Sequence, residues 1–262
     1  MKKIALLVFL GLIIVEGACS KYGNMLTFEK EKDFCARTIS EKIVAAIVQE
    51  KSVRLLRYVL DEYEIADINQ VDWGGRPFIL IAARETKRSP SGMFNLLYPN
   101  MVPFVREFLN RKANINIQDK ESGNTALHYA CGNFNIELVL LLLAYDANKN
   151  IKNKKKENPL DVALRKLRED CFVAVEKFEY AKIIKILIEN GAKRSRKFNK
   201  GLGSAIEHFE IEIEELHESF SDISGKVRKK YVDERWEWIE DMDSLYAAER
   251  ILRSIVNFEE KA

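Results

Sequence analysis

The chain has 262 residues, of which 47% are apolar and 31% are charged. Its 42 Lys and Arg residues nearly balance its 40 Asp and Glu residues, so the formal net charge is only +2. This balance gives no global electrostatic reason to expect nucleic acid or a membrane surface as a partner.

The first twenty residues have the pattern of a secretory signal peptide. Lys2 and Lys3 precede an apolar run over residues 4–15, and small residues follow at 17–20. The run is too short to span a bilayer, which needs about 20 residues. We therefore expect residues 1–20 to direct export of a bacterial protein to the periplasm, the cell envelope or the cell surface.

Two ways of processing this signal remain open. Ala18 and Ser20 suit ordinary release after Ser20, which would leave a freely secreted chain. Gly17-Ala18-Cys19 instead resembles the end of a bacterial lipoprotein signal, in which the cysteine is lipidated. Glu16 stands where that pattern has Leu or a similar residue. We expect a lipid tether at Cys19, with free secretion as the alternative.

After an N-terminal segment over 21–39, the chain predicts two pairs of short helices. Apolar residues within 43–47 and 53–60 follow a helical spacing rather than a two-residue alternation. The second pair begins near Arg76-Pro77-Phe78-Ile79 and ends with a helix over 102–111. Residues 84–100 are an insertion between these two helices, with Pro and Gly flanking a short apolar turn.

The clearest feature is an echo at a spacing of 33 residues, in which Thr125-Ala126-Leu127-His128-Tyr129-Ala130 returns as Asn158-Pro159-Leu160-Asp161-Val162-Ala163. Both stretches follow the pattern T-P-L-H-x-A, so the chain resembles the ankyrin repeat family. The motif positions are Thr125, Leu127, His128 and Ala130, and in the second copy Pro159, Leu160 and Ala163. The resemblance implies that His128 fixes its turn by hydrogen bonding near Thr125.

A second marker follows each repeat, because the family ends its second helix with a turn containing Ala. The chain has such a turn at Ala66, Ala113, Ala147 and Ala192. Only the middle interval is close to the family period, which places insertions at 84–100 and at about 167–178. The resemblance implies an all-α solenoid of three to four helix-turn-helix repeats over residues 40–199.

Residues 200–262 lack the repeat motif but keep a helical period. Apolar residues from Ile206 to Phe220 are spaced three and four apart. Two further helices are predicted over 227–239 and 245–256, with Asp243 or Ser244 as the cap of the last. Because the end of a solenoid exposes an apolar face, we expect these helices to cover the last repeat. A separate interaction module is the alternative.

Few residues suggest chemistry. Apart from Cys19 the cysteines are Cys35, Cys131 and Cys171, an odd number without the close spacing of a zinc site or a disulfide framework. We expect Cys131 in the core and leave a Cys35–Cys171 pair open. His217 is not part of an H-E-x-x-H motif, and no phosphate-binding loop occurs. The sequence predicts no enzyme, no metal, no cofactor, no small-molecule substrate and, for lack of aromatics among its lysines, no nucleic-acid partner.

In the resembled family, loops and first helices form a concave groove that binds proteins, so the leading expectation is a protein-interaction scaffold of the bacterial cell envelope. An alternative is an inhibitor or protector of a periplasmic enzyme, with residues 84–100 entering its cleft. A second alternative is an enzyme with its chemistry in the C-terminal helices. The candidate partner-binding residues are Trp73, Arg76, Lys120, Glu121, Tyr129, Asn133, Phe134, Lys154, Lys155 and Lys156.

Overall fold

The structure is a computed structural model that describes the backbone of residues 38–63, 67–72, 74–85, 100–169, 174–223 and 232–257. Within these ranges the side chains of residues 169, 175, 216–223, 232–242 and 257 are not described. The predicted signal peptide, Cys19, Cys35, Trp73 and Cys171 lie outside the described residues.

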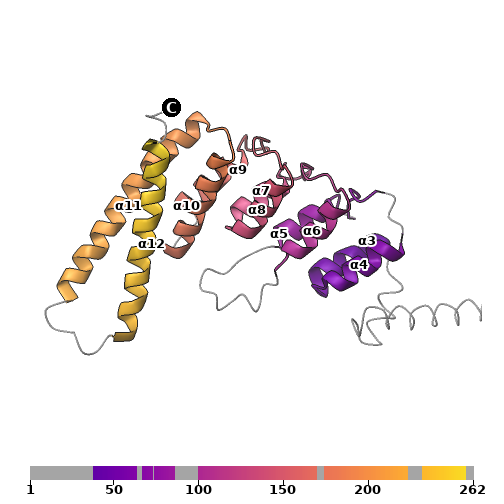
Figure 1. The fold of residues 1–262 in the computed structure, drawn as a ribbon, viewed down its shortest axis with the longest axis horizontal. Helices are drawn as coiled ribbons and strands as arrows, with labels where there is room; N and C mark the ends of the chain where they lie inside the picture. Colours follow the sequence, from indigo (N-terminus) through magenta and orange to yellow (C-terminus); the bar gives the residue numbers. More distant parts are fainter. Residues whose placement is uncertain are drawn as a thin grey trace, which may run out of the picture. The chain divides into compact units, whose positions relative to one another are not determined.

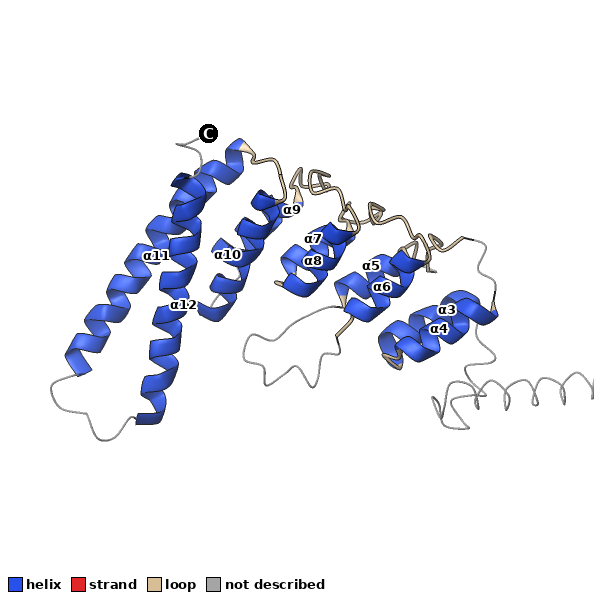
Figure 2. Ribbon diagram, viewed as in Figure 1, coloured by secondary structure: helices blue, strands red, loops and turns tan. Residues whose placement is uncertain are grey.

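The described chain is built from helices (Figure 2). In the described ranges the only strand-like pairing is an isolated antiparallel bridge between Val71 and Pro77. The predicted all-α fold class is therefore confirmed. None of the described helices combines the length and the apolar run needed to cross a membrane. The chain divides into two compact units, Met1–Glu85 with Pro103–Asn114 and Thr86–Val102 with Ile115–Ala262.

The first unit contains two helix pairs, as the sequence predicts. Helix α3 (Ile39–Val44) continues into the π-helical turn η1 (Ala45–Gln49), and α4 (Val53–Glu62) returns beside it. The second pair is α5 (Phe78–Arg84) and α6 (Val102–Asn110).

The inward faces of these helices are apolar, and a salt bridge joins α4 to α6. Ile43, Leu56 and Phe108 are at most 1% exposed. Arg57 Nε donates to Glu107 Oε2 at 2.7 Å. Burying each such side chain stabilises the fold by about 1.5–3 kcal/mol, more than the half-exposed salt bridge contributes.

The second unit continues the alternation with α7 (Ala126–Gly132), α8 (Ile136–Ala144), α9 (Pro159–Glu169) and α10 (Ala174–Glu189). Helix α7 packs on α8 and on α9, while α10 packs on both α9 and α8. First helices therefore stack on first helices and second helices on second helices (Figure 1). This is the solenoid arrangement that the repeat spacing predicts.

The insertion predicted at about 167–178 lengthens both helices of its pair. Helix α9 has 11 residues where α7 has 7, and α10 has 16 where α8 has 9. Of the insertion predicted at 84–100, residues 86–99 lie outside the described residues.

Helices α11 (Arg196–Ile223) and α12 (Val232–Asn257) form a hairpin that packs on the last repeat. Helix α11 packs on α9, and α12 packs on α10 and on α11. The two helices thus occupy the places of the first and second helices of a further repeat. The predicted C-terminal helical cap is confirmed, and α11 begins at Arg196, a few residues before the expected start at 200.

One detail of the predicted cap is wrong. The sequence predicts separate helices over 227–239 and 245–256, but α12 is continuous from Val232 to Asn257. Asp243 and Ser244 lie inside it and cap nothing at a helix start. The reason is tertiary packing, because Leu245, Ala248 and Leu252 are at most 1% exposed and this burial outweighs the weak helix propensity of Asp and Ser.

Side chains of three helices meet in the cap. Ala174 of α10, Ile213 of α11 and Leu245 of α12 form one buried cluster. Lys177 of α10 is 5% exposed and donates to Glu212 Oε1 of α11 at 2.6 Å. A Cβ on Gly201 of α11 would lie 3.0 Å from Leu164 Cδ2, so a glycine here allows α11 to approach α9 closely.

Successive turns are joined by one repeated hydrogen bond, which we call the asparagine ladder. Asn69 Oδ1 accepts from the backbone N–H of Asn114 at 2.6 Å, within the first unit. In the second unit Asn116 Oδ1 accepts from Asn148 N–H, and Asn150 Oδ1 from Lys193 N–H, both at 2.8 Å. The bond recurs although the sequence separations differ, so the insertions leave the stacking geometry unchanged.

Three hairpin loops, which we call the fingers, lie before the first helices at residues 72–76, 119–124 and 153–157. Each opens with Asp72, Asp119 or Asn153, whose side-chain oxygens accept from two later backbone N–H groups of the loop. Near its end each has a left-handed residue, Gly75 (φ 72°), Gly123 (φ 72°) or Lys156 (φ 62°). The short polar side chain that opens each finger therefore fixes its shape.

We expect Gly123→Ala to destabilise the second unit by at least about 1 kcal/mol, because L-residues are strained at this φ. The new Cβ would also lie 3.0 Å from the backbone nitrogen of Lys154. The control is Gly203→Ala, since Gly203 is exposed in α11 and its Cβ would have nothing within 4 Å. The control should be more stable than the natural chain by up to about 1 kcal/mol, because alanine favours a helix more than glycine does. Urea unfolding checks both, and equal stabilities would contradict the finger geometry.

Candidate binding surface

Two neighbouring fingers of the second unit are held side by side. The Lys154 backbone N–H donates to Ser122 O and Asn153 Nδ2 donates to Asn124 Oδ1, each at 2.9 Å. Lys154 Nζ also donates to the backbone carbonyl of Lys120. Because these bonds join the two loops, the finger tips are held together with the side chains of Lys120, Lys155 and Lys156 exposed.

His128 connects one repeat to the next. Its Nδ1 accepts from Thr125 N–H at 3.1 Å and lies 2.8 Å from Thr125 Oγ1, which is the hydrogen bonding expected from the sequence. Its Nε2 lies 3.1 Å from the carbonyl oxygen of Glu157 in the following finger. Since a carbonyl can only accept, Nε2 carries the proton and the ring is neutral. Burial lowers the pKa of His128 below its ordinary value.

Asp161 plays the same part in the next repeat. It exchanges two hydrogen bonds with Asn158 at the start of α9, one of 2.8 Å and one of 3.2 Å. Its Oδ1 accepts from Ser195 Oγ at 2.7 Å, and Ser195 Oγ in turn accepts from Phe198 N–H at the start of α11. The departure from histidine at the fourth motif position therefore keeps the function of that position.

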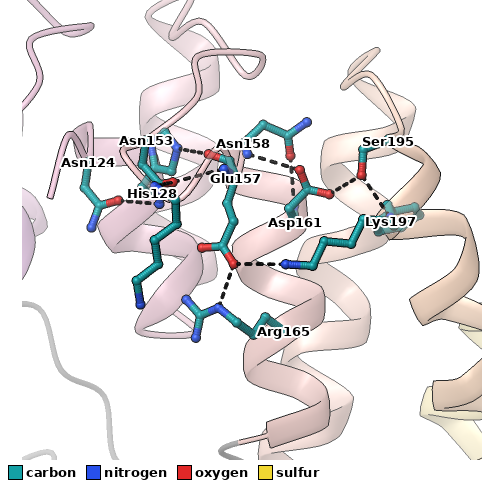
Figure 3. A network of polar contacts seen from close by, with 11 residues as sticks. Asn124, His128, Asn153, Glu157, Asn158, Asp161, Arg165, Ser195 and Lys197 are labelled. Carbon is teal, nitrogen blue, oxygen red and sulfur yellow. Dashed lines mark hydrogen bonds and ion pairs between the residues drawn. The ribbon is translucent and has the colours of Figure 1, made fainter.

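A buried carboxylate lies where the last finger, α9 and α11 meet (Figure 3). Glu157 is 3% exposed, and its Oε1 lies 3.0 Å from Arg165 Nε of α9 and 3.8 Å from Lys197 Nζ of α11. Its Oε2 is buried and has no hydrogen-bond partner. Two cations from different helices thus converge on one acid at the base of the finger.

The predicted binding residues of the second unit divide into two groups. Lys120, Glu121 and the three lysines 154–156 lie exposed on the two fingers. Tyr129 is half-buried beside them, and its hydroxyl donates to Asp119 Oδ2 at 2.8 Å. Burial and the Asp119 carboxylate raise the pKa of Tyr129, so its hydroxyl stays a proton donor that supports the finger.

The second group lies at the other end of α7. Asn133 and Phe134 form the bend between α7 and α8, where Phe134 is left-handed with a φ of 41°. The Phe134 ring packs edge-on against the ring of Tyr180 in α10, with 5.7 Å between the ring centroids. Tyr180 Oη donates to Gly132 O at 2.8 Å. Packing accounts for Phe134 without a partner.

The first unit holds the remaining predicted residues. Arg76 donates to Asp72 Oδ2 from Nε at 2.9 Å and from Nη2 at 2.7 Å, with 42% of its side chain exposed. These two charge-assisted hydrogen bonds to one carboxylate oxygen stiffen the finger 72–76. Trp73, which shares that finger, lies outside the described residues.

Sequence reasoning missed Arg165, Glu157 and Asp161 as parts of the polar network around the last finger. Lys197 belongs to a basic stretch that is visible in the sequence, but nothing there pairs it with Glu157, which is 40 positions away. The available signal is that Glu157 directly precedes the second motif copy and that Asp161 lies within it.

The comparisons with known proteins agree with this geometry. Residues 93–197 match the family model of ankyrin repeats (3 copies). The repeats within residues 93–197 are ankyrin repeats. Members of this family generally act as protein-interaction scaffolds without catalytic activity, so the helical stack with its fingers is the part expected to contact another protein.

Three curated relatives are similar over parts of the chain. Protein glp-1 of Caenorhabditis elegans is 28% identical over 49% of this chain and 10% of its own length. Ankyrin repeat protein L92 of Acanthamoeba polyphaga mimivirus is 46% identical over 24% of this chain and 16% of its own. Neurogenic locus notch homolog protein 1 of Xenopus tropicalis is 41% identical over 22% of this chain and 2% of its own length. The chain spans only a small part of the length of each relative.

The described residues offer little beyond this surface. Among them no group of three or more His, Cys, Asp and Glu side chains could hold a metal ion. Cys131 is fully buried in the ankyrin core, as predicted, and burial raises the pKa of its thiol. A buried thiol of raised pKa is a poor nucleophile at neutral pH.

The ankyrin stack should lose stability in mild acid because of His128. Its pKa is lowered in the folded state, so between its ordinary value near 6.5 and the folded value only the unfolded chain takes up the proton. Stability is retained above about pH 6.5 and falls as the pH decreases, by up to about 1.4 kcal/mol per pH unit in that window.

Chemical unfolding at pH 7, 6 and 5 measures this loss. His128→Gln should be less stable at pH 7 but show a flatter pH dependence. The control His208→Gln, at an exposed position of α11, should keep the slope of the natural chain. If the unfolding free energy of His128→Gln depends on pH as steeply as that of the natural chain, another group causes the loss of stability in acid.

Proposed function

We propose that this chain is a protein-interaction scaffold that holds a partner against the fingers of its ankyrin stack. The observation that carries the proposal is the fixed pair of fingers at 119–124 and 153–157. Hydrogen bonds join the two loops to each other, while the side chains of Lys120, Glu121 and the three lysines 154–156 remain exposed. A surface whose backbone is already ordered loses little conformational entropy when it binds.

The cap supports this proposal over a catalytic one. Helices α11 and α12 pack on α9 and α10 in the positions of a further hairpin, which gives the C-terminal residues a structural task. The alternative of an inhibitor depends on the predicted insertion 84–100, most of which lies outside the described residues. That alternative stays a prediction.

Site-specific photo-crosslinking tests the scaffold. A photoreactive phenylalanine derivative is placed at Glu121 or Lys155 on the fingers, and at Lys185 on α10 as the control, where the side chain is 47% exposed. We expect crosslinked partner proteins several-fold more abundant from the finger positions, measured by mass spectrometry after irradiation of cells. Equal yields at all three positions would refute the finger assignment.

We further propose that residues 1–20 direct export of a bacterial protein and that Cys19 receives a lipid, which would place the scaffold at the cell envelope. The support is the sequence pattern of Lys2, Lys3, the apolar run and Gly17-Ala18-Cys19. Labelling cells with radioactive palmitate should mark the natural chain and not Cys19→Ser. Incorporation equal in both chains would exclude Cys19, and a labelled Cys131→Ser control should match the natural chain.

A further inference from the structure

We infer that the scaffold binds an acidic polypeptide segment of its partner at a surface formed by Lys154, Lys155, Lys156, Arg165 and Lys197. We call these residues the basic surface. The inference rests on the proposed scaffold function and specifies the chemistry of the partner. It also assigns part of the contact to α9 and to the first turn of α11, and not to the finger alone.

Glu157 assembles this surface from three elements. Arg165 of α9 and Lys197 of α11 both approach its Oε1, at 3.0 Å and 3.8 Å (Figure 3). The Glu157 side chain is 4% exposed, whereas the Arg165 side chain is 25% and the Lys197 side chain 78% exposed. The carboxylate is therefore hidden at the base of the finger, and the cations around it reach solvent.

The exposed charged residues of segments 149–168 and 190–203 are all basic. In segments 149–168 and 190–203 the only acidic residues are Glu157 and Asp161, which are 3% and 8% exposed. Asp161 is further engaged by Asn158 and Ser195. The neighbouring finger adds Lys120 together with Glu121. Clustered charges of one sign within about one Debye length, about 8 Å at physiological salt, attract an oppositely charged segment and speed its association.

The composition of the surface favours a carboxylate-rich polypeptide over other anions. Binding of single-stranded nucleic acid normally adds aromatic side chains on which bases stack. In these two segments the only aromatic residue is Phe198, which is 1% exposed. Peripheral membrane binding normally adds exposed apolar side chains, and the large exposed hydrophobic residues of the described chain all lie outside these segments. Lysine and arginine alone suit carboxylates, which accept charge-assisted hydrogen bonds.

Fluorescence anisotropy with a labelled twelve-residue peptide of alternating Glu and Asp tests the inference at 50 mM NaCl. The test variant is Lys155→Glu with Lys156→Glu, and the matched control is Lys182→Glu with Lys185→Glu on α10, which changes the net charge equally. We expect the test variant to bind about tenfold more weakly than the natural chain and the control to stay within about twofold. Circular dichroism checks that each variant is folded.

Two results would overturn the inference: equal weakening in both variants, which would indicate overall charge alone, or unchanged binding by the finger variant. Tighter binding of a twelve-residue oligothymidine, or of phosphatidylglycerol vesicles, than of the peptide would also overturn it in favour of that partner class. If Lys156→Glu prevents folding, Lys155→Gln with Lys156→Gln replaces it, with a smaller loss expected. If the natural chain does not bind the peptide but the finger positions still crosslink to partner proteins, the acidic partner is refuted and the scaffold function is not.

Discussion

The fold depends on hydrogen bonds that run from a side chain of one repeat to the backbone of the next. In the asparagine ladder an amide oxygen of Asn69, Asn116 or Asn150 accepts a backbone N–H of the following turn. Because the donor is a backbone group, the bond fixes the path of the chain and not the identity of the next side chain. Each turn can then vary in sequence while its distance to the neighbouring turn is preserved.

The same logic explains why the two copies of the motif differ without consequence for the stack. His128 reaches the carbonyl of Glu157, and Asp161 reaches the hydroxyl of Ser195. His128 donates a hydrogen bond to a carbonyl oxygen, whereas Asp161 accepts one from a hydroxyl group. The partner in the following repeat has therefore changed together with the side chain. Each residue also caps its own helix, which aligns the start of α7 or α9 before the next element is added.

Much of this architecture can be predicted from the sequence because the motif and the helical period recur. The burial of Ile43, Leu127 and Leu160 follows directly from that period. The continuity of α12 through Asp243 could not be predicted, because it is decided by burial against α10 and not by local propensity. The convergence of Arg165 and Lys197 on Glu157 was also beyond local patterns, since the three residues are 8 and 40 positions apart in sequence and meet only after the helices stack.

The lengths of α11 and α12 have a consequence for how such an array could grow. They have 28 and 26 residues, against 7 and 9 in the hairpin of α7 and α8. At about 1.5 Å per residue they extend some 40 Å, so a duplicated ankyrin unit joined after them would meet a flank several times longer than its own. A short repeat placed against α11 and α12 could therefore cover only part of the flank that these two helices present.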